Sequence, residues 1–102
     1  MLEANKPHYI FLMHDDGSDD DENDWTPYLE TLKKRGSFEG GSAVGDGVCL
    51  RKAGPVPSLT RHLTGYIRVT ADGIENAKAM LAGNPHYENG GTVEIRELLR
   101  TD

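Results

Sequence analysis

The hydrophobic and polar positions of the chain follow two periods, one typical of strands and the other of helices. Apolar residues at every second position, or short fully apolar runs, predict strands. Apolar residues at intervals of three and four predict helices that bury one face. Four segments fit the strand pattern, namely residues 8–14, 37–44, 62–70 and 92–98.

Two segments have helical spacing. The first has its apolar residues at i, i+3, i+4 and i+7, and these are Trp25, Tyr28, Leu29 and Leu32. In the second, Asp72 and Glu75 have the spacing of a capping box, Gly83 closes the helix and Pro85 prevents its continuation. The buried face predicted for this second helix consists of Ile74, Ala77, Met80 and Leu81.

The order of these elements is strand, helix, strand, strand, helix, strand, with an inserted hairpin. The hairpin is predicted from a turn at residues 45–47 and a short returning strand at residues 48–51. This βαββαβ order predicts one ferredoxin-like α+β domain over residues 1–102. Its four-stranded antiparallel sheet would carry both helices on one face.

The first predicted strand is apolar on both faces, with Tyr9, Phe11 and Met13 on one and Ile10 and Leu12 on the other. Two helices can cover only one face of the sheet. A second sheet would bury the other face, and a second copy of the chain is its simplest source. We therefore predict a homodimer of the dimeric α/β barrel type, and a sheet face left open to water is the alternative.

Charge changes this picture in one segment. Residues 15–24 are predicted to form an acidic loop, and they contain seven acidic residues. The net charge of the whole chain is −6, so this loop accounts for all of the negative excess. The remainder is thus close to neutral, so we expect neither nucleic-acid nor membrane binding. The longest apolar run is too short to span a membrane, no signal peptide is evident, and Cys49 is the single cysteine. A cytoplasmic protein is expected.

The order and spacing of several short motifs resemble the YCII-related family, in the branch that contains the DGPF proteins. The matching residues, spread from Tyr9 to Glu97, are Trp25, Leu32, Gly36, Gly40-Gly41, Gly54-Pro55, Leu63, Gly65-Tyr66, Asn84-Pro85 and Val93-Glu94-Ile95-Arg96. The resemblance implies a ferredoxin-like fold that dimerises by bringing two sheets together. It also places the edge of a pocket near His86, and Trp25 is a further candidate ligand-binding residue.

The chain departs from the family where catalysis has been assigned. The YCII branch has a histidine where this chain has Trp25, and an aspartate where it has Asn84. Of the signature of the DGPF branch only Gly54-Pro55 is kept. No catalytic residue is therefore transferred from either branch.

The face of the sheet without helices is predicted to carry Tyr66, Arg68, Glu94 and Arg96. The two arginines could hold a carboxylate or enolate, and Glu94 could act as a base if burial raised its pKa. Alternatively, Glu94 and Arg96 form an ion pair in the dimer interface. His14 ends the first strand beside two aspartates and is the second candidate for proton transfer.

No cofactor is predicted. The histidines show neither HxH nor HExxH spacing, so no metal site is assigned, although His14 with nearby acids stays a weaker metal alternative. We expect one of two functions. The first is acid–base chemistry on a small organic acid or cyclic metabolite, and the second is a non-catalytic module that binds a small, anionic ligand or dimerises.

Overall fold

The structure, a computed structural model, describes residues 6–17 and 22–99. Its helices and strands, in chain order, are β1 (His8–His14), α1 (Glu22–Lys34), β2 (Phe38–Ala43), β3 (Leu63–Thr70), α2 (Ile74–Ala79), α3 (Pro85–Glu88) and β4 (Val93–Leu98). The strands form one antiparallel sheet in the order β2-β3-β1-β4. The predicted α+β class and the four-stranded antiparallel sheet are confirmed. No helix among the described residues could cross a membrane.

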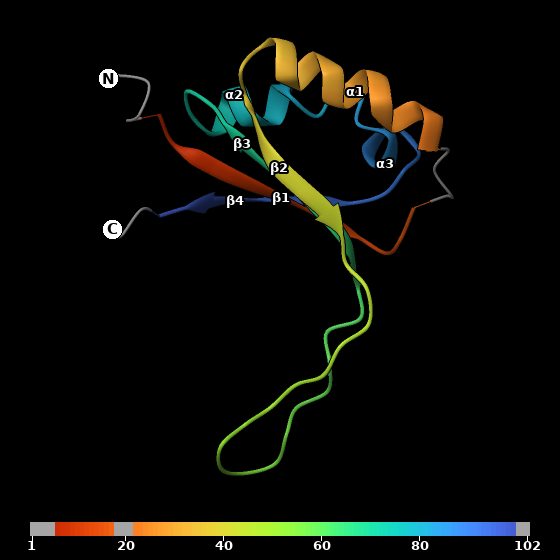
Figure 1. Cartoon of the computed structure of the whole chain (residues 1–102), viewed down its shortest axis with the longest axis vertical. Coiled ribbons are helices and arrows are strands. Elements are labelled where there is room, and N and C mark those ends of the chain that lie inside the picture. The colour runs from red at the N-terminus through yellow and green to blue at the C-terminus, as the bar shows by residue number, and fades with distance from the viewer. Residues whose placement is uncertain (1–5, 18–21, 100–102) are drawn as a thin grey trace.

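The three helices lie on one side of the sheet (Figure 1). Alternation along β1 sends Tyr9, Phe11 and Met13 towards them, and all three side chains are buried. The core is completed by residues of β3, of the helices and of the segments that directly follow β3 and α2: Tyr28, Leu32, Ile67, Val69, Ala71, Ala77, Met80 and Leu81.

The opposite side of the sheet, which we call the open face, has no helix over it. Direct pairing across β1 places Tyr66, Leu12 and Glu94 in one row and Arg68, Ile10 and Arg96 in the next. Directly paired residues of an antiparallel sheet point to the same face. Ile10 and Leu12 are half-buried there, although they lie outside the core of the chain.

The predicted hairpin is wrong. Residues 44–62 contain no strand and form a long loop between β2 and β3, which we call the arm (Figure 1). The end of β2 pairs with β3, and the Val44 amide still donates to the Thr64 carbonyl at 2.9 Å, so the chain does not turn back at residues 45–47.

Two details of the second helical region also differ from the prediction. The cap of α2 is Gly73, with no side-chain hydrogen bond, so the capping box of Asp72 and Glu75 is wrong, and Ile74 is 45% exposed. Glu75 instead accepts a hydrogen bond from Lys78 at 3.1 Å. A third helix, α3, begins at Pro85, which was predicted only to end the preceding one.

Candidate functional site

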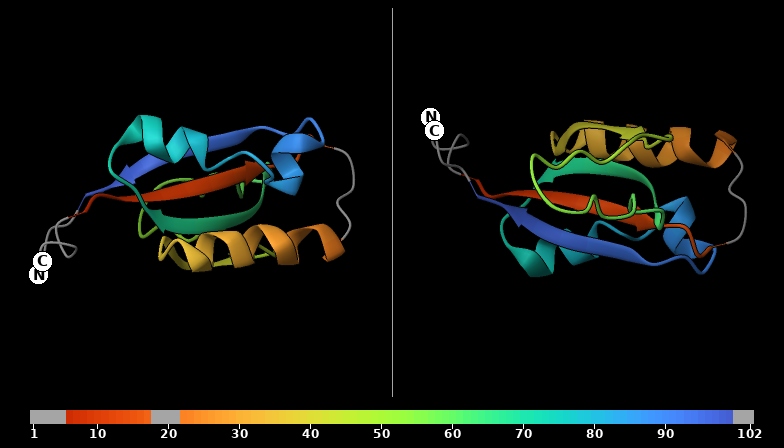
Figure 2. Two further views of the ribbon diagram at one scale, coloured as in Figure 1. Left: turned by 90° about the horizontal axis from the view of Figure 1, so that it is seen from above. Right: turned by 90° about the horizontal axis from the view of Figure 1, so that it is seen from below.

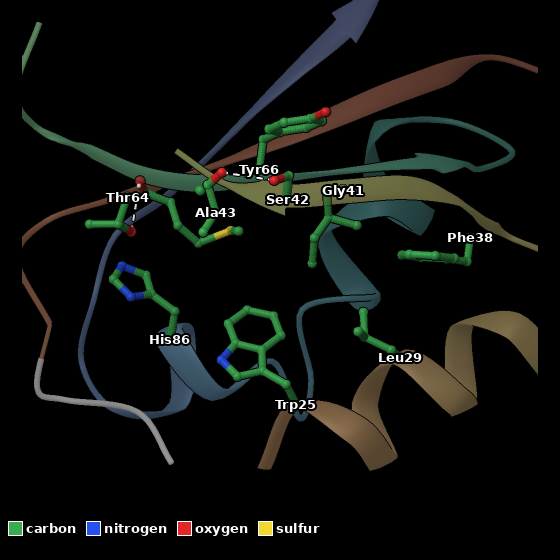
Figure 3. A pocket seen from close by; sticks show the side chains of 12 residues that line it. Trp25, Leu29, Phe38, Gly41, Ser42, Ala43, Thr64, Tyr66 and His86 are labelled. Atoms are coloured by element: carbon green, nitrogen blue, oxygen red, sulfur yellow. Dashed lines mark hydrogen bonds between the residues drawn. The ribbon is translucent and has the colours of Figure 1, made fainter. Parts of the chain in front are cut away.

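A pocket of about 390 Å³ lies on the helix side of the sheet, between α1, α3 and the strands β2 and β3 (Figure 3). Its volume is near the lower end of the range of about 300–1,000 Å³ that small-molecule sites occupy. The pocket is lined by Met13, Trp25, Leu29, Phe38, Gly41, Ser42, Ala43, Thr64, Gly65, Tyr66, Ile67 and His86.

The helix α1 supplies the apolar wall of this pocket. Its spacing sends Tyr28 and Leu32 into the core and leaves Trp25 and Leu29 partly buried beside it. The Tyr28 hydroxyl donates a hydrogen bond to the carbonyl of Met80 at 2.9 Å, and its ring meets Trp25 edge-to-face at 6.0 Å. Tyr28 thus fixes both the helix and the indole that faces the pocket.

His86 closes one end of the pocket, where its ring lies opposite Trp25 in the close view (Figure 3). It is placed by α3, which begins where the Asn84 side chain accepts a hydrogen bond from the Tyr87 amide at 3.0 Å. The His86 side chain is only 7% exposed. A Cβ atom at position 91 would overlap the His86 ring, so the ring can lie here only because residue 91 is a glycine.

An aspartate stands beside His86 at this end. Asp16 Oδ1 lies 3.7 Å from His86 Nε2. The Asp16 carboxylate also accepts two hydrogen bonds from Thr92, one from its amide at 2.8 Å and one from its hydroxyl at 2.6 Å. These hydrogen bonds lower the pKa of Asp16, so it is a carboxylate at neutral pH. His86 therefore has a fixed negative charge next to its ring.

A second polar cluster occupies the open face. Glu94 joins His14 and Arg96, with Oε1 at 3.0 Å from His14 Nε2 and Oε2 accepting from the Arg96 guanidinium at 3.1 Å. The His14 ring also meets His62 edge-to-face at 5.1 Å. The hydrogen bonds to His14 and Arg96 lower the pKa of Glu94, which is opposite to the rise expected from burial.

The other two predicted residues of this face lie apart from that cluster. Arg68 donates to the carbonyl of Glu39 at 2.7 Å and so turns towards the edge strand β2 rather than towards Arg96. Tyr66 contributes to the pocket lining, but its ring points to the opposite side of the sheet from Trp25 and His86 (Figure 3).

The sheet therefore divides the predicted site in two. Trp25 and His86 line the pocket on the helix side, whereas His14, Glu94 and Arg96 form the cluster on the open face. Sequence reasoning missed Asp16, because its partner Thr92 is 76 positions away. It also missed the cap of α3, although an Asn-Pro pair is a usual start of a helix.

No three histidine, cysteine, aspartate or glutamate side chains gather closely enough to hold a metal ion within residues 6–17 and 22–99. Asp19, Asp20 and Asp21 of the predicted acidic loop lie outside these described residues, and the predicted end of the loop at residue 24 is wrong because α1 already begins at Glu22.

Comparison with known proteins gives no relative from which a function could be transferred. The chain matches no protein-family model and no curated protein. Its function is inferred below from the pocket and from the open face.

Proposed function

We propose that this chain is a YCII-related, ferredoxin-like protein that works as a homodimer and binds a small cyclic metabolite in the pocket under α1. The strand order β2-β3-β1-β4, with all helices on one side, supports the ferredoxin-like assignment. The motifs from Trp25 to Arg96 support the family.

The open face supports the homodimer. Ile10, Leu12 and Tyr66 form an apolar strip across β1 and β3, and no helix of the chain covers it. A second sheet packed against this strip at about 10 Å would remove it from water. In that arrangement the His14, Glu94 and Arg96 cluster lies in the interface, where Arg96 is also placed to hold an anionic group.

The pocket carries the proposal for a ligand. Trp25, Leu29 and Phe38 give it aromatic and aliphatic walls, and His86 is a polar group at one end. Such a site favours a small ring that is apolar over most of its surface and has one polar substituent directed at the histidine. Binding is the function that this geometry supports best.

A second function, acid–base catalysis, is favoured by the pairing of His86 with Asp16. The Asp16 carboxylate lies 3.7 Å from His86 Nε2 and can orient the imidazole for proton transfer. Glu94 and His14 are less suited to this role at the pocket, because they lie on the other side of the sheet and the lowered pKa of Glu94 makes it a weak base.

Ligand binding can be tested through Trp25, the one tryptophan of the chain. Titration with a panel of small cyclic and aromatic acids, alcohols and amides is expected to change Trp25 emission and to raise the melting temperature with ligand concentration. Ala43→Phe should abolish both effects because the new ring would occupy the pocket. Val44→Phe is the matched control, since Val44 is exposed and does not line the pocket.

Ligand binding and acid–base catalysis can be distinguished by experiment once a ligand is found. Nuclear magnetic resonance of the ligand after incubation will show it unchanged if the protein only binds it. Conversion that is lost in His86→Asn, with binding retained, would establish the catalytic function. The proposal is wrong if Ala43→Phe and the wild type bind every compound equally.

A further inference from the structure

The end of the pocket at His86 is built from segments that are distant in the sequence. Seen from above, the end of β1, the start of α1 and the short helix α3 lie at one end of the molecule (Figure 2). The backbone also packs against the His86 ring, since a Cβ atom at Gly17 would lie 3.2 Å from its Cε1 atom and one at Gly91 would overlap it. A ligand group that contacts the buried His86 must therefore give up much of its water.

The charges at this end of the pocket are negative or balanced. The carboxylate of Asp16 lies 3.7 Å from His86 Nε2. The pair sums to zero if the imidazole is protonated and to a single negative charge if it is neutral. In the sequence, neither residues 15–24 nor residues 84–92 contain a lysine or an arginine. This end therefore has no net positive charge with which to balance an anion.

The cations nearest to consider are bound elsewhere or lie in water. Of the described residues that line the pocket, none is a lysine, arginine, aspartate or glutamate. Lys33 lies over the Phe38 ring, 5.6 Å from its centroid, but it is exposed and its charge is screened by water. Arg68 donates to a backbone carbonyl at 2.7 Å, and Arg96 donates to Glu94 at 3.1 Å.

The walls of the pocket favour a cation over an anion. Trp25 and Phe38 are aromatic, and the faces of aromatic rings attract positive charge. The amides in the first turn of α1 attract anions, but that turn already contains Glu22 and Asp24. An anionic group would thus lose its hydration without gaining a counter-ion, which costs far more than burying a neutral amide.

We propose that the pocket selects neutral or positively charged ring compounds and rejects carboxylates and other anions of the same shape. The substituent that faces His86 is then an amide, an amine or an amidine. Asp16 determines this selectivity, because its carboxylate lies beside the histidine that the substituent meets. The inference rests on the proposed ligand-binding function and narrows the class of its ligand.

Three compounds of nearly equal shape test this selectivity. Benzamidine, benzamide and benzoate share one planar ring, and at neutral pH their substituents are positive, neutral and negative. Ligand-observed nuclear magnetic resonance and Trp25 emission give the dissociation constant of each. We expect benzamidine and benzamide to bind at least about tenfold more tightly than benzoate. Binding that is lost in Ala43→Phe identifies the pocket as the site.

A substitution of Asp16 tests the origin of the selectivity. Asp16→Asn should lower the ratio of benzamidine to benzamide affinity by about threefold or more, because it removes the nearby negative charge. Asp15→Asn removes the same charge from the neighbouring exposed residue and is the matched control, which should leave the ratio nearly unchanged. An unchanged ratio in Asp16→Asn would contradict the role of this residue.

The wild-type protein decides the main inference even if Asp16→Asn does not fold. Benzoate bound as tightly as benzamide, with both lost in Ala43→Phe, would overturn the charge selectivity and leave the ligand-binding function intact. If none of the three compounds binds in the pocket, the ligand-binding function fails together with this inference.

Discussion

Individual side chains connect distant parts of this chain to the end of the pocket. Asp16 follows β1, yet its hydrogen bonds go to Thr92 just before β4, and its charge faces His86 of α3. Trp25 and His86, two of the candidate ligand-binding residues, lie on the lining of the pocket. Asp16 could not be assigned, because nothing in its neighbourhood along the chain indicates which residues it meets.

The two hydrogen bonds from Thr92 predict how stability depends on pH. They lower the pKa of Asp16 below its ordinary value of 3.8, so the carboxylate stabilises the fold above that value. This stability is lost as the pH falls through the lowered pKa. Asp16→Asn should therefore be less stable than the wild type at neutral pH, and the difference should shrink in acid. Urea unfolding of both proteins across this range measures it, and a difference independent of pH would contradict the assignment.

The backbones of β2 and β3 lie so close together at Gly41 that we expect a larger residue at this position to destabilise the fold. A Cβ atom at Gly41 would lie 2.5 Å from the Tyr66 carbonyl oxygen and 3.1 Å from the Ile67 Cα atom. Because both are backbone atoms, Gly41→Ala should destabilise the fold by about 1–3 kcal/mol. Gly45→Ala is the control, since a Cβ atom there meets nothing within 4 Å. Equal melting temperatures for the two variants would contradict this account.

At the scale of elements, the strands were predictable and the connections were not. Burial alternates along β1 and β3 as the sequence pattern requires, because each strand has one face on the core. Val48 and Leu50 looked like part of a returning strand, but β-branched and aliphatic residues make a strand only where a partner supplies hydrogen bonds. Here the hydrogen bonds at the end of β2 go to β3, and residues 48–51 find no partner strand.

The short helix α3 depends on its cap, which yields a prediction at this scale. Asn84 is fully buried, and its side chain accepts from the Tyr87 amide. Asn84→Ala should therefore cost about 1–2 kcal/mol and loosen His86 at the pocket. Asn84→Ser keeps a capping oxygen and should retain more of the stability. Urea unfolding compares them, and an Asn84→Ala protein as stable as the wild type would show that the cap is unimportant.

In the whole molecule, one face of the sheet is covered by helices and the other, the open face, is not. The helices protect one side of the sheet, while the other carries Ile10 and Leu12 and faces the same direction as the arm. The sequence predicted this asymmetry, because two helices cannot cover two faces. It could not predict that the arm would extend beside the open face, since that direction depends on how β2 and β3 end.

The solution mass tests the central claim that a second copy covers the open face. Light scattering over a range of concentrations should give about twice 11.2 kDa for the wild type. Leu12→Glu, which places a charge in the middle of the open face, should reduce the mass to that of one chain while the helical content stays unchanged. A wild-type mass of 11.2 kDa at every concentration would contradict the account.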